Sequence, residues 1–359
     1  MKLLDLTLRE GEQRPGVHYS VDQKISAARE LDSLGVDYIQ IGFPIADSRT
    51  AAVCDRTDLN ASTTGIARSI PSDVMAAIEA GVDVVDLFAP TSDRQLDHIL
   101  GIDRNELSEK VIEAATVAHD HGVEVHFSAM DGFRTEPAAL DDLFDAVDAE
   151  LYTIADTVGS RTPADVVKHL KALNTELSNI GAHFHDDLGV GTANALAAGR
   201  LGVGKVDLSV AGLGERAGNA ALEEFVAATI VGDESIDIDV TENKLLPVTK
   251  SVLATLDEDV KPEKSLLGRE VFSHESGLHT AAMLNKPSTF EPFDPAQFGG
   301  KRQLLFGNAT GRGAARRLLE RCDKQATEGQ IDRLLELLQT DSQEKLSFDE
   351  AISLAKEVN

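Results

Sequence analysis

Residues 62–88 read STTGIARSIPSDVMAAIEAGVDVVDLF and contain one complete strand–helix–strand unit. Ser62–Ile66 and Val82–Phe88 are short runs rich in aliphatic and β-branched residues, which are typical of buried strands. Between them, Pro71–Ala80 has helical periodicity, starts with proline at its first position and ends just before Gly81. This order predicts two parallel strands that are joined by a crossover helix.

The same alternation recurs from residue 2 to about residue 232. The predicted strands are Leu3–Leu8, Val36–Ile41, Ser62–Ile66, Val82–Phe88, Val123–Phe127, Leu151–Ile154, Ala182–Phe184 and Lys205–Val210. The other predicted helices between them are Val21–Leu34, Asn105–His121, Pro163–Leu177 and Thr192–Leu201. Eight such units predict an α/β fold, a (β/α)8 TIM barrel over residues 1–235. A doubly wound open sheet is the alternative, but no glycine-rich nucleotide loop follows the first strand.

The periodicity weakens beyond the barrel. Residues 233–240 are acidic and resemble a linker. The helices predicted after it are Glu242–Thr255, Arg312–Arg321, Gln330–Leu338 and Ser347–Val358. We therefore expect residues 236–359 to form a linker and a small, mainly helical C-terminal subdomain.

The charge balance restricts the partners. The 359 residues include 61 Asp and Glu against 34 Lys and Arg, a formal net charge of −27. Nucleic acid and anionic membranes are therefore unsuitable partners, because both are bound through clustered basic side chains. Acidity spread along the whole chain resembles proteins of salt-accumulating archaea, in which salt screens the self-repulsion. A merely acidic protein from a low-salt organism is the alternative.

Targeting and cysteine signals are absent from the sequence. Cys54 and Cys322 lie far apart and outside any C-x-x-C motif, which argues against a disulfide framework or a thiolate zinc site. The first residues lack the apolar stretch of a signal peptide, and no apolar run has the ~20 residues of a membrane span. We expect a cytoplasmic protein.

Two histidines mark the end of the seventh predicted strand. His183 and His185 share one face of it, and a divalent metal can accept two imidazoles at that spacing. Glu10 and Asn219, which follow the first and eighth strands, could add oxygen ligands. Such a mixed set fits Mg²⁺, Mn²⁺, Fe²⁺, Co²⁺ or Zn²⁺ and does not choose among them.

The first predicted strand also carries polar side chains. Alternation along Leu3–Leu8 places Asp5, Thr7 and Arg9 on one face, toward the barrel interior. Buried Asp and Arg need partners. A structural Asp5–Arg9 ion pair is therefore the alternative to a substrate-binding role. Similarly, the glycine-rich segment 211–221 either approaches a ligand or is a tight turn with Glu215 and Arg216 as a surface pair.

A family resemblance becomes apparent from several stretches together. They are DLTLREGEQRPG (5–16), GFP (42–44), ADTVG (155–159), HFHDDLG (183–189), GLGERAGNAALE (212–223) and residues 272–313, with SHESGLH at 273–279. They resemble the acyl-CoA-dependent 2-oxo acid condensing enzymes: 2-isopropylmalate, homocitrate and citramalate synthases. The resemblance implies a homodimer that uses acetyl-CoA and a 2-oxo acid in amino-acid biosynthesis. It also implies that the leucine-sensing regulatory domain of longer relatives is absent.

The resemblance also implies residue roles. A divalent metal is expected on Glu10, His183, His185 and Asn219. The expected catalytic residues are Arg9 and His279, and the expected substrate-binding residues are Arg9, Gln13, Asp86, His126, Ser128 and Thr157.

Three positions depart from the family pattern. Met130 occupies the place of a catalytic Glu, and a thioether cannot transfer protons. His126 replaces an Arg that binds the distal carboxylate in homocitrate synthases, and Phe290 replaces a Tyr that works with the histidine. Two alternatives to a synthase therefore remain: changed chemistry on the same scaffold, such as aldol cleavage or another acyl donor, and a non-catalytic metabolite-binding paralogue.

Overall fold

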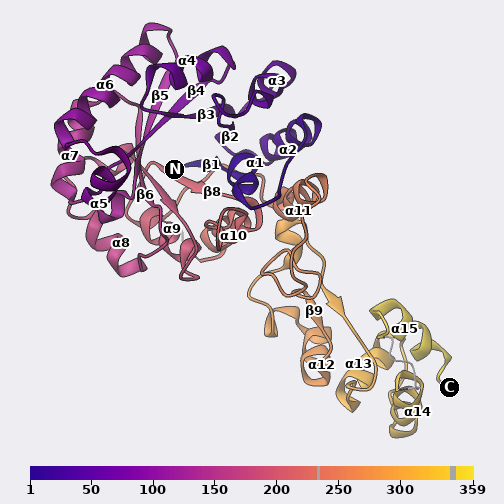
Figure 1. Cartoon of the computed structure of the whole chain (residues 1–359). Coiled ribbons are helices and arrows are strands. Elements are labelled where there is room, and N and C mark those ends of the chain that lie inside the picture. Colours follow the sequence, from indigo (N-terminus) through magenta and orange to yellow (C-terminus); the bar gives the residue numbers. More distant parts are fainter. Residues whose placement is uncertain (233–234, 340–344) are drawn as a thin grey trace. The chain divides into compact units, whose positions relative to one another are not determined.

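Eight parallel strands close into a barrel in the order β1 to β8, and helices surround it (Figure 1). The computed structural model describes residues 1–232, 235–339 and 345–359. The strands are β1 Lys2–Asp5, β2 Tyr38–Gly42, β3 Ser62–Arg68, β4 Val84–Pro90, β5 Glu124–Met130, β6 Leu151–Asp156, β7 Ile180–Phe184 and β8 Lys205–Leu208. Closure comes from pairing of β1 with β8, with Asp5 opposite Leu208. The predicted (β/α)8 barrel is confirmed.

The barrel helices follow the expected pattern, with start signals where the sequence places them. They include α2 Val21–Leu34, α3 Arg49–Arg56, α4 Pro71–Glu79, α6 Arg104–Asp120, α7 Pro137–Ala146, α8 Pro163–Leu170, α9 Gly191–Arg200 and α10 Leu222–Gly232. Helix α2 starts with a capping box formed by Ser20 and Gln23. The sequence did not indicate α3, α7 or α10, because α3 is short and α10 is apolar on most faces.

Two predicted elements are markedly shorter in the structure, and others differ by a few residues at their ends. Helix α8 ends at Leu170 because the Asp141 carboxylate accepts the backbone N–H groups of Asn174 and Thr175, which a longer helix would need. Strand β1 ends at Asp5, whose carboxylate accepts the backbone N–H and the hydroxyl of Thr7, both at 2.9 Å.

Residues Thr7–Glu10 therefore form a helical turn, α1, and not the end of a strand. The prediction that Asp5, Thr7 and Arg9 share one strand face was wrong, because side-chain hydrogen bonds to Asp5 stop the strand. The alternative of an Asp5–Arg9 ion pair is also incorrect, since Arg9 pairs with Glu10.

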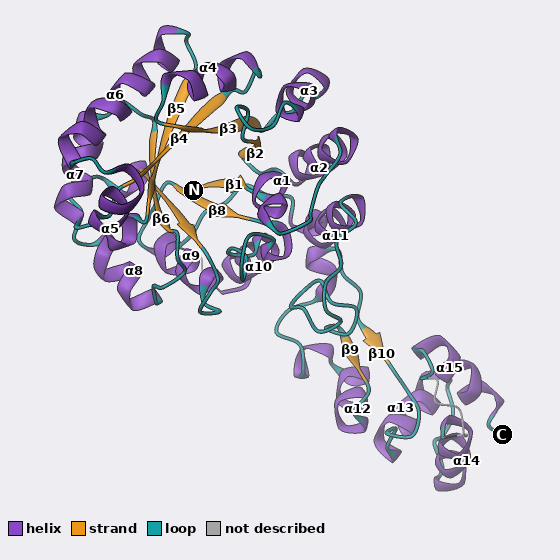
Figure 2. Cartoon of the chain, in the orientation of Figure 1, coloured by secondary structure: helices purple, strands orange, loops and turns teal. Residues whose placement is uncertain are grey.

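The chain divides into two compact units, one comprising Met1–Thr241 with Val248–Asp259 and the other Glu242–Pro247 with Val260–Asn359. Residues 233–234 of the predicted linker lie outside the described residues. The predicted helical segments are present as α11 Leu245–Thr255, α13 Arg312–Arg321, α14 Glu328–Leu338 and α15 Phe348–Glu357 (Figure 2). Most of α11 belongs to the first unit. The second unit contains α13, α14 and α15 together with α12 Gly277–Asn285 and a two-stranded sheet of β9 Ser273–His274 and β10 Gln303–Leu304.

The second unit has its own core. Apolar residues of α13, α14 and α15 pack around Phe306, with Leu318 and Leu334 fully buried. No helix in the described ranges of the chain is long and apolar enough to cross a membrane.

Candidate active site

A cavity of about 170 Å³ lies at the carboxyl ends of the barrel strands, where barrel enzymes place their chemistry. Its lining includes most of the predicted site residues, namely Arg9, Glu10, Gln13, Asp86, Ser128, Thr157, His183 and His185. Ile66, Phe88, Met130 and Ala155 supply its apolar wall. Residues that are distant in sequence thus meet in one pocket.

The predicted metal ligands meet on one side of this cavity. Glu10, His183 and His185 are buried, and one ligand atom of each lies within 4.8 Å of the others. Glu10 Oε2, His185 Nδ1 and Asn219 Oδ1 are buried without a hydrogen-bond partner among the described residues. Buried polar atoms normally have partners, so these three suit a bound ion. The residues present therefore fit a divalent metal.

The charge states of these ligands also favour a cation. Burial alone would raise the pKa of Glu10, but Arg9 and the two histidines outweigh it and hold that pKa below its usual value. Burial, aided by repulsion from His183, lowers the pKa of His185 to about 3. A carboxylate and a neutral imidazole are the forms that bind metals.

A buried acid sets the orientation of His183. Asp207 Oδ2 lies 3.5 Å from His183 Nδ1, and its Oδ1 lies 3.1 Å from the ammonium of Lys205. Burial opposes ionisation of Asp207, but Lys205 and His183 outweigh it and lower its pKa. A carboxylate beside one ring nitrogen leaves the other, Nε2, free for a further partner.

A chain of hydrogen bonds holds Arg9 beside Glu10 in the lining of the cavity. Its Nε donates to Gln40 Oε1 at 2.6 Å, and its Nη1 lies 2.5 Å from Glu10. Gln40 in turn donates to Asp86 at 3.1 Å, which also accepts a bond of 2.7 Å from the Ser128 hydroxyl. Arg9, Asp86 and Ser128 therefore form one linked wall and not three separate contacts.

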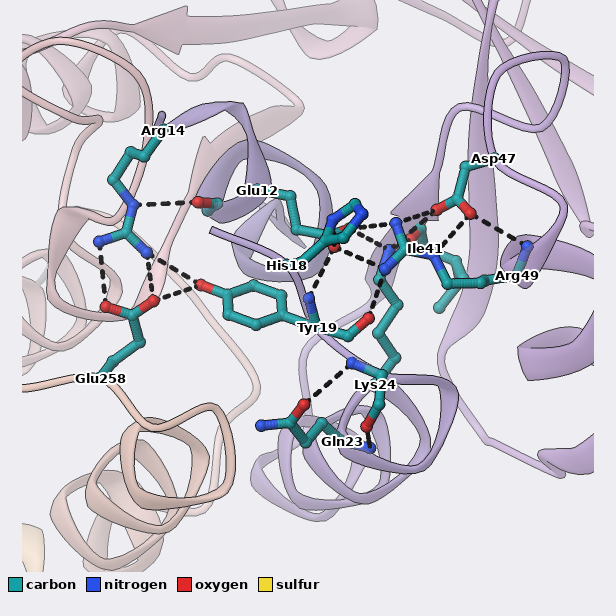
Figure 3. A network of polar contacts seen from close by, with 12 residues as sticks. Glu12, Arg14, His18, Tyr19, Gln23, Lys24, Ile41, Asp47, Arg49 and Glu258 are labelled. Atoms are coloured by element: carbon teal, nitrogen blue, oxygen red, sulfur yellow. Dashed lines mark hydrogen bonds and ion pairs between the residues drawn. The ribbon is translucent and has the colours of Figure 1, made fainter. Parts of the chain in front are cut away.

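A second polar network holds the turn that follows Glu10 (Figure 3). Arg14 donates to the carbonyl of Gly11 at 2.9 Å and to Tyr19, and both side chains contact Glu258. Next to it, the fully buried Lys24 lies 2.6 Å from Glu12. These contacts fix residues 11–20, and with them the position of Glu10.

The glycine-rich segment after β8 brings Asn219 to the site. A β-bridge pairs Asn219 with His185, and the Asn219 amide donates to the Leu213 carbonyl at 3.2 Å. Gly218 has φ +93°, and a Cβ there would lie 2.0 Å from the Gly212 carbonyl oxygen, so only glycine fits. Glu215 contacts Arg216, as the surface-pair alternative expects, but it also lines the cavity.

The position of the missing glutamate is occupied by an apolar side chain. Met130 is the last residue of β5 and lines the cavity. Asp131 does not compensate, because it is buried against Arg134 at 2.6 Å and Ser92 at 2.5 Å and is not part of the lining. The Thr157 hydroxyl accepts the backbone N–H of Asp131 at 2.8 Å.

Three predicted residues lie outside the cavity lining: Asn219, which borders the ligands as described above, and two histidines. His126 is fully buried below Ser128 on β5, with Nε2 3.0 Å from Glu124 and its ring edge-on to Tyr38. His279 lies on α12 of the second unit, stacked on Phe290 with 3.9 Å between ring centroids. The proposed roles of both histidines stay predictions.

Sequence reasoning missed Gln40 and Asp207. Gln40 interrupts the apolar strand YIQIG, and Asp207 stands between Val206 and Leu208 in KVDL; these polar interruptions were the available signal. Because interior positions of a strand normally carry apolar side chains, such residues point to an inward polar contact.

Comparison with known proteins places the chain in a family. Residues 1–252 match the HMGL-like family, and residues 266–345 match the homocitrate synthase post-HMGL domain-like family. A homocitrate synthase from Methanopyrus kandleri is 38% identical over 338 residues, which cover 92% of this chain and 85% of that protein. A protein named "Probable 2-isopropylmalate synthase" from the same organism is 36% identical over 346 residues, 93% of this chain and 68% of the relative.

Solved structures support the fold. Hydroxymethylglutaryl-CoA lyase from Pseudomonas aeruginosa matches with a TM-score of 0.62 and 24% identity, over 72% of this chain and 93% of that chain. The matched families and the curated relatives establish that the chain belongs to the HMGL-like family, in its group of 2-isopropylmalate, homocitrate and citramalate synthases.

Proposed function

We propose that this protein is a metal-dependent acyltransferase that condenses acetyl-CoA with a 2-oxo acid, giving a 2-hydroxy di- or tricarboxylic acid for amino-acid biosynthesis. One observation carries the proposal: Glu10, His183 and His185 converge in a cavity that Arg9 also lines, 2.5 Å from Glu10. The names of the curated relatives support the same reaction type.

Glu10, His183 and His185 would hold the metal, with Asn219 as a fourth donor. A divalent ion there supplies Lewis acidity toward the keto and carboxylate oxygens of a 2-oxo acid. The ligand set suits Mg²⁺, Mn²⁺, Zn²⁺ or Co²⁺.

The protein's own groups position the oxo acid and stabilise developing charge. Arg9, held by Gln40 and Gln13, donates toward the keto oxygen as it becomes an alkoxide. The Thr157 hydroxyl hydrogen is not used by its bond to the Asp131 N–H, so it can donate to the substrate carboxylate. Phe88 and Met130 supply apolar surface at this end of the cavity.

A base must remove a proton from the acetyl methyl group. The resulting enolate carbon forms a bond to the keto carbon, and water then cleaves the thioester to release CoA as a thiol. Met130 cannot accept the proton. Glu215 is the least enclosed carboxylate of the lining, with its side chain 37% exposed, and we assign the base to it. His279, on the second unit, keeps the acid–base role that the family resemblance implies for it.

Thiol release from acetyl-CoA tests the proposal. The purified protein would be assayed at high salt with Mn²⁺ or Mg²⁺ against pyruvate, 2-oxoisovalerate and 2-oxoglutarate. Release that depends on both metal and oxo acid supports the proposal. A folded, metal-loaded protein that releases no thiol with any acid would exclude it.

Met130 favours one alternative, changed chemistry on the same scaffold. In that case the unaltered protein has weak synthase activity, and Met130→Glu raises it strongly. A fully active natural synthase rejects this alternative. A non-catalytic metabolite-binding role predicts metal and oxo-acid binding by calorimetry without turnover of any substrate.

The proposal includes three expectations from the sequence: a homodimer, a cytoplasmic location and a salt-rich environment. Light scattering of the purified protein at high salt tests the first directly.

A further inference from the structure

A second cavity, about 520 Å³, adjoins the proposed oxo-acid site and has no role in the reaction described above. It lies between the ends of β3, β4 and β5 and helix α6, and its lining is mostly apolar, including Ile70, Pro90, Ile99, Ile102 and Leu107. Phe88 and Met130 line both cavities. The two side chains therefore form a shared wall.

The shared wall has one adaptable member. The Met130 backbone is held by Thr91, whose N–H and hydroxyl donate to its carbonyl at 3.0 and 2.9 Å. Its side chain is unbranched and flexible, so it can change rotamer without disturbing the strand. A glutamate in its place would put a charge on this wall.

The charged groups of the second cavity already have partners. Arg68 lies 2.6 Å from Asp73, and Lys110 lies 3.7 Å from Glu106. In the oxo-acid cavity the wall beside Phe88 carries Asp86, itself an anion. A distal carboxylate would therefore meet repulsion and no uncommitted cation, whereas an alkyl chain would meet Ile, Leu and Pro.

Resting on the proposed function, we infer that the acceptor is an aliphatic monocarboxylic 2-oxo acid whose alkyl tail passes between Phe88 and Met130 into the second cavity. The carboxylate and keto group of the oxo acid would face the metal that Glu10, His183 and His185 would hold. The alkyl tail of the oxo acid then points toward the apolar wall of Phe88 and Met130. Each methylene that is buried there should raise kcat/KM about fourfold. Met130 then helps to select the substrate, in addition to replacing the glutamate of the family pattern.

A chain-length series tests the inference on the unaltered protein. Pyruvate, 2-oxobutanoate, 2-oxohexanoate and 2-oxooctanoate would be compared with 2-oxoglutarate in thiol-release assays with acetyl-CoA. We expect kcat/KM to rise at least tenfold from pyruvate to 2-oxooctanoate, with 2-oxoglutarate below pyruvate. Turnover that is confined to pyruvate or 2-oxoglutarate overturns the tail site but leaves the proposed function intact. No turnover with any acid overturns both.

Ile102→Glu places a charge in the second cavity away from the metal ligands. This variant should lower the ratio of kcat/KM for 2-oxooctanoate to kcat/KM for pyruvate at least tenfold. Its kcat/KM for pyruvate should change by less than twofold. Ile112→Glu is the matched control, because Ile112 is exposed on α6 outside this cavity. Ile102→Trp, which fills the cavity, should repeat the effect.

The same variants exclude other occupants of the cavity. An equal loss with pyruvate, through a raised KM for acetyl-CoA, would assign the cavity to the donor's pantetheine arm. A change in molar mass by light scattering would assign it to a subunit contact. Either result overturns the inference.

Discussion

Asp207 lies beside His183, with 3.5 Å between its Oδ2 and the Nδ1 of the imidazole. The acid is buried and also contacts Lys205, so it is held in place from both sides. Although it is not a ligand in the proposed site, it selects the tautomer in which His183 Nε2 is free to bind a metal.

Asp207→Asn should weaken Mn²⁺ binding by about 10- to 100-fold, because an amide neither fixes the tautomer nor raises the basicity of the imidazole. Isothermal titration calorimetry measures the affinity. Asp22→Asn, which alters an exposed acid paired with Arg56, is the control and should bind as the parent does. Unchanged affinity in Asp207→Asn would show that Asp207 only stabilises the barrel.

Gln40→Met should lower kcat by about 10- to 100-fold, because Arg9 loses the acceptor that holds its guanidinium. Mn²⁺ affinity should change little, since Gln40 contacts none of the proposed ligands. Steady-state kinetics and calorimetry together separate the two effects. An equal loss of metal binding would mean that the substitution disturbs the site as a whole.

Glu12→Gln should destabilise the protein by about 3 kcal/mol, because Lys24 is fully buried and loses its 2.6 Å ion pair. Denaturant unfolding measures the free energy. The double variant Glu12→Gln, Lys24→Met should recover part of the loss, since it also removes a buried ammonium that would keep only the Ile41 carbonyl at 3.0 Å and Asp47 at 3.5 Å. Simple additivity of the two single losses would argue that the pair is not coupled.

The free energy of unfolding should also fall as the pH is lowered, because His169 resists protonation in the folded protein. Burial, with repulsion from Arg161, lowers the pKa of this histidine to about 4 in the folded protein, whereas an unfolded histidine titrates near 6.5. The folded state therefore binds fewer protons between these values, so this contribution is complete above pH 6.5 and is lost as the pH falls toward 4.

His169→Phe should remove this dependence and keep the ring packing against Phe133. The free energy of unfolding of the parent, relative to the variant, should fall by about 1 kcal/mol between pH 7 and pH 5, allowing for solvent screening. Urea unfolding at both pH values provides the comparison. Parallel curves for the two proteins would contradict the assignment.

The KM for acetyl-CoA should fall as KCl is raised from low to high concentration. A net charge of −27 repels anionic substrates, and salt screens that field. Circular dichroism at each concentration confirms that the fold persists. If KM rises while the fold is intact, the surface charge is not the dominant influence.

The barrel was predictable because its strands are short apolar runs separated by capped helices, as in residues 62–88. The turn after β1 was not, because a single side chain, Asp5, takes the Thr7 N–H and overrides the alternation of the sequence. Periodicity describes which residues are buried; it does not include such side-chain hydrogen bonds.

The site was predictable to the extent that it depends on strand ends. His183, His185 and Glu10 each follow or end a strand, and barrel closure brings them together. The contacts of Gln40 and Asp207 depend on which strands are neighbours and on their stagger, and one sequence alone does not provide that information.

The proposed ligands lie on either side of the seam at which the barrel closes. Glu10 follows β1, the histidines end β7, and β8 pairs with both strands. Residues 11–182 separate the ligands along the chain, so a nascent polypeptide has no complete site until nearly the whole barrel has been made. A metal that binds only this assembled set would link the first and last parts of the barrel. The stability of the closed barrel would then rise with the concentration of the metal.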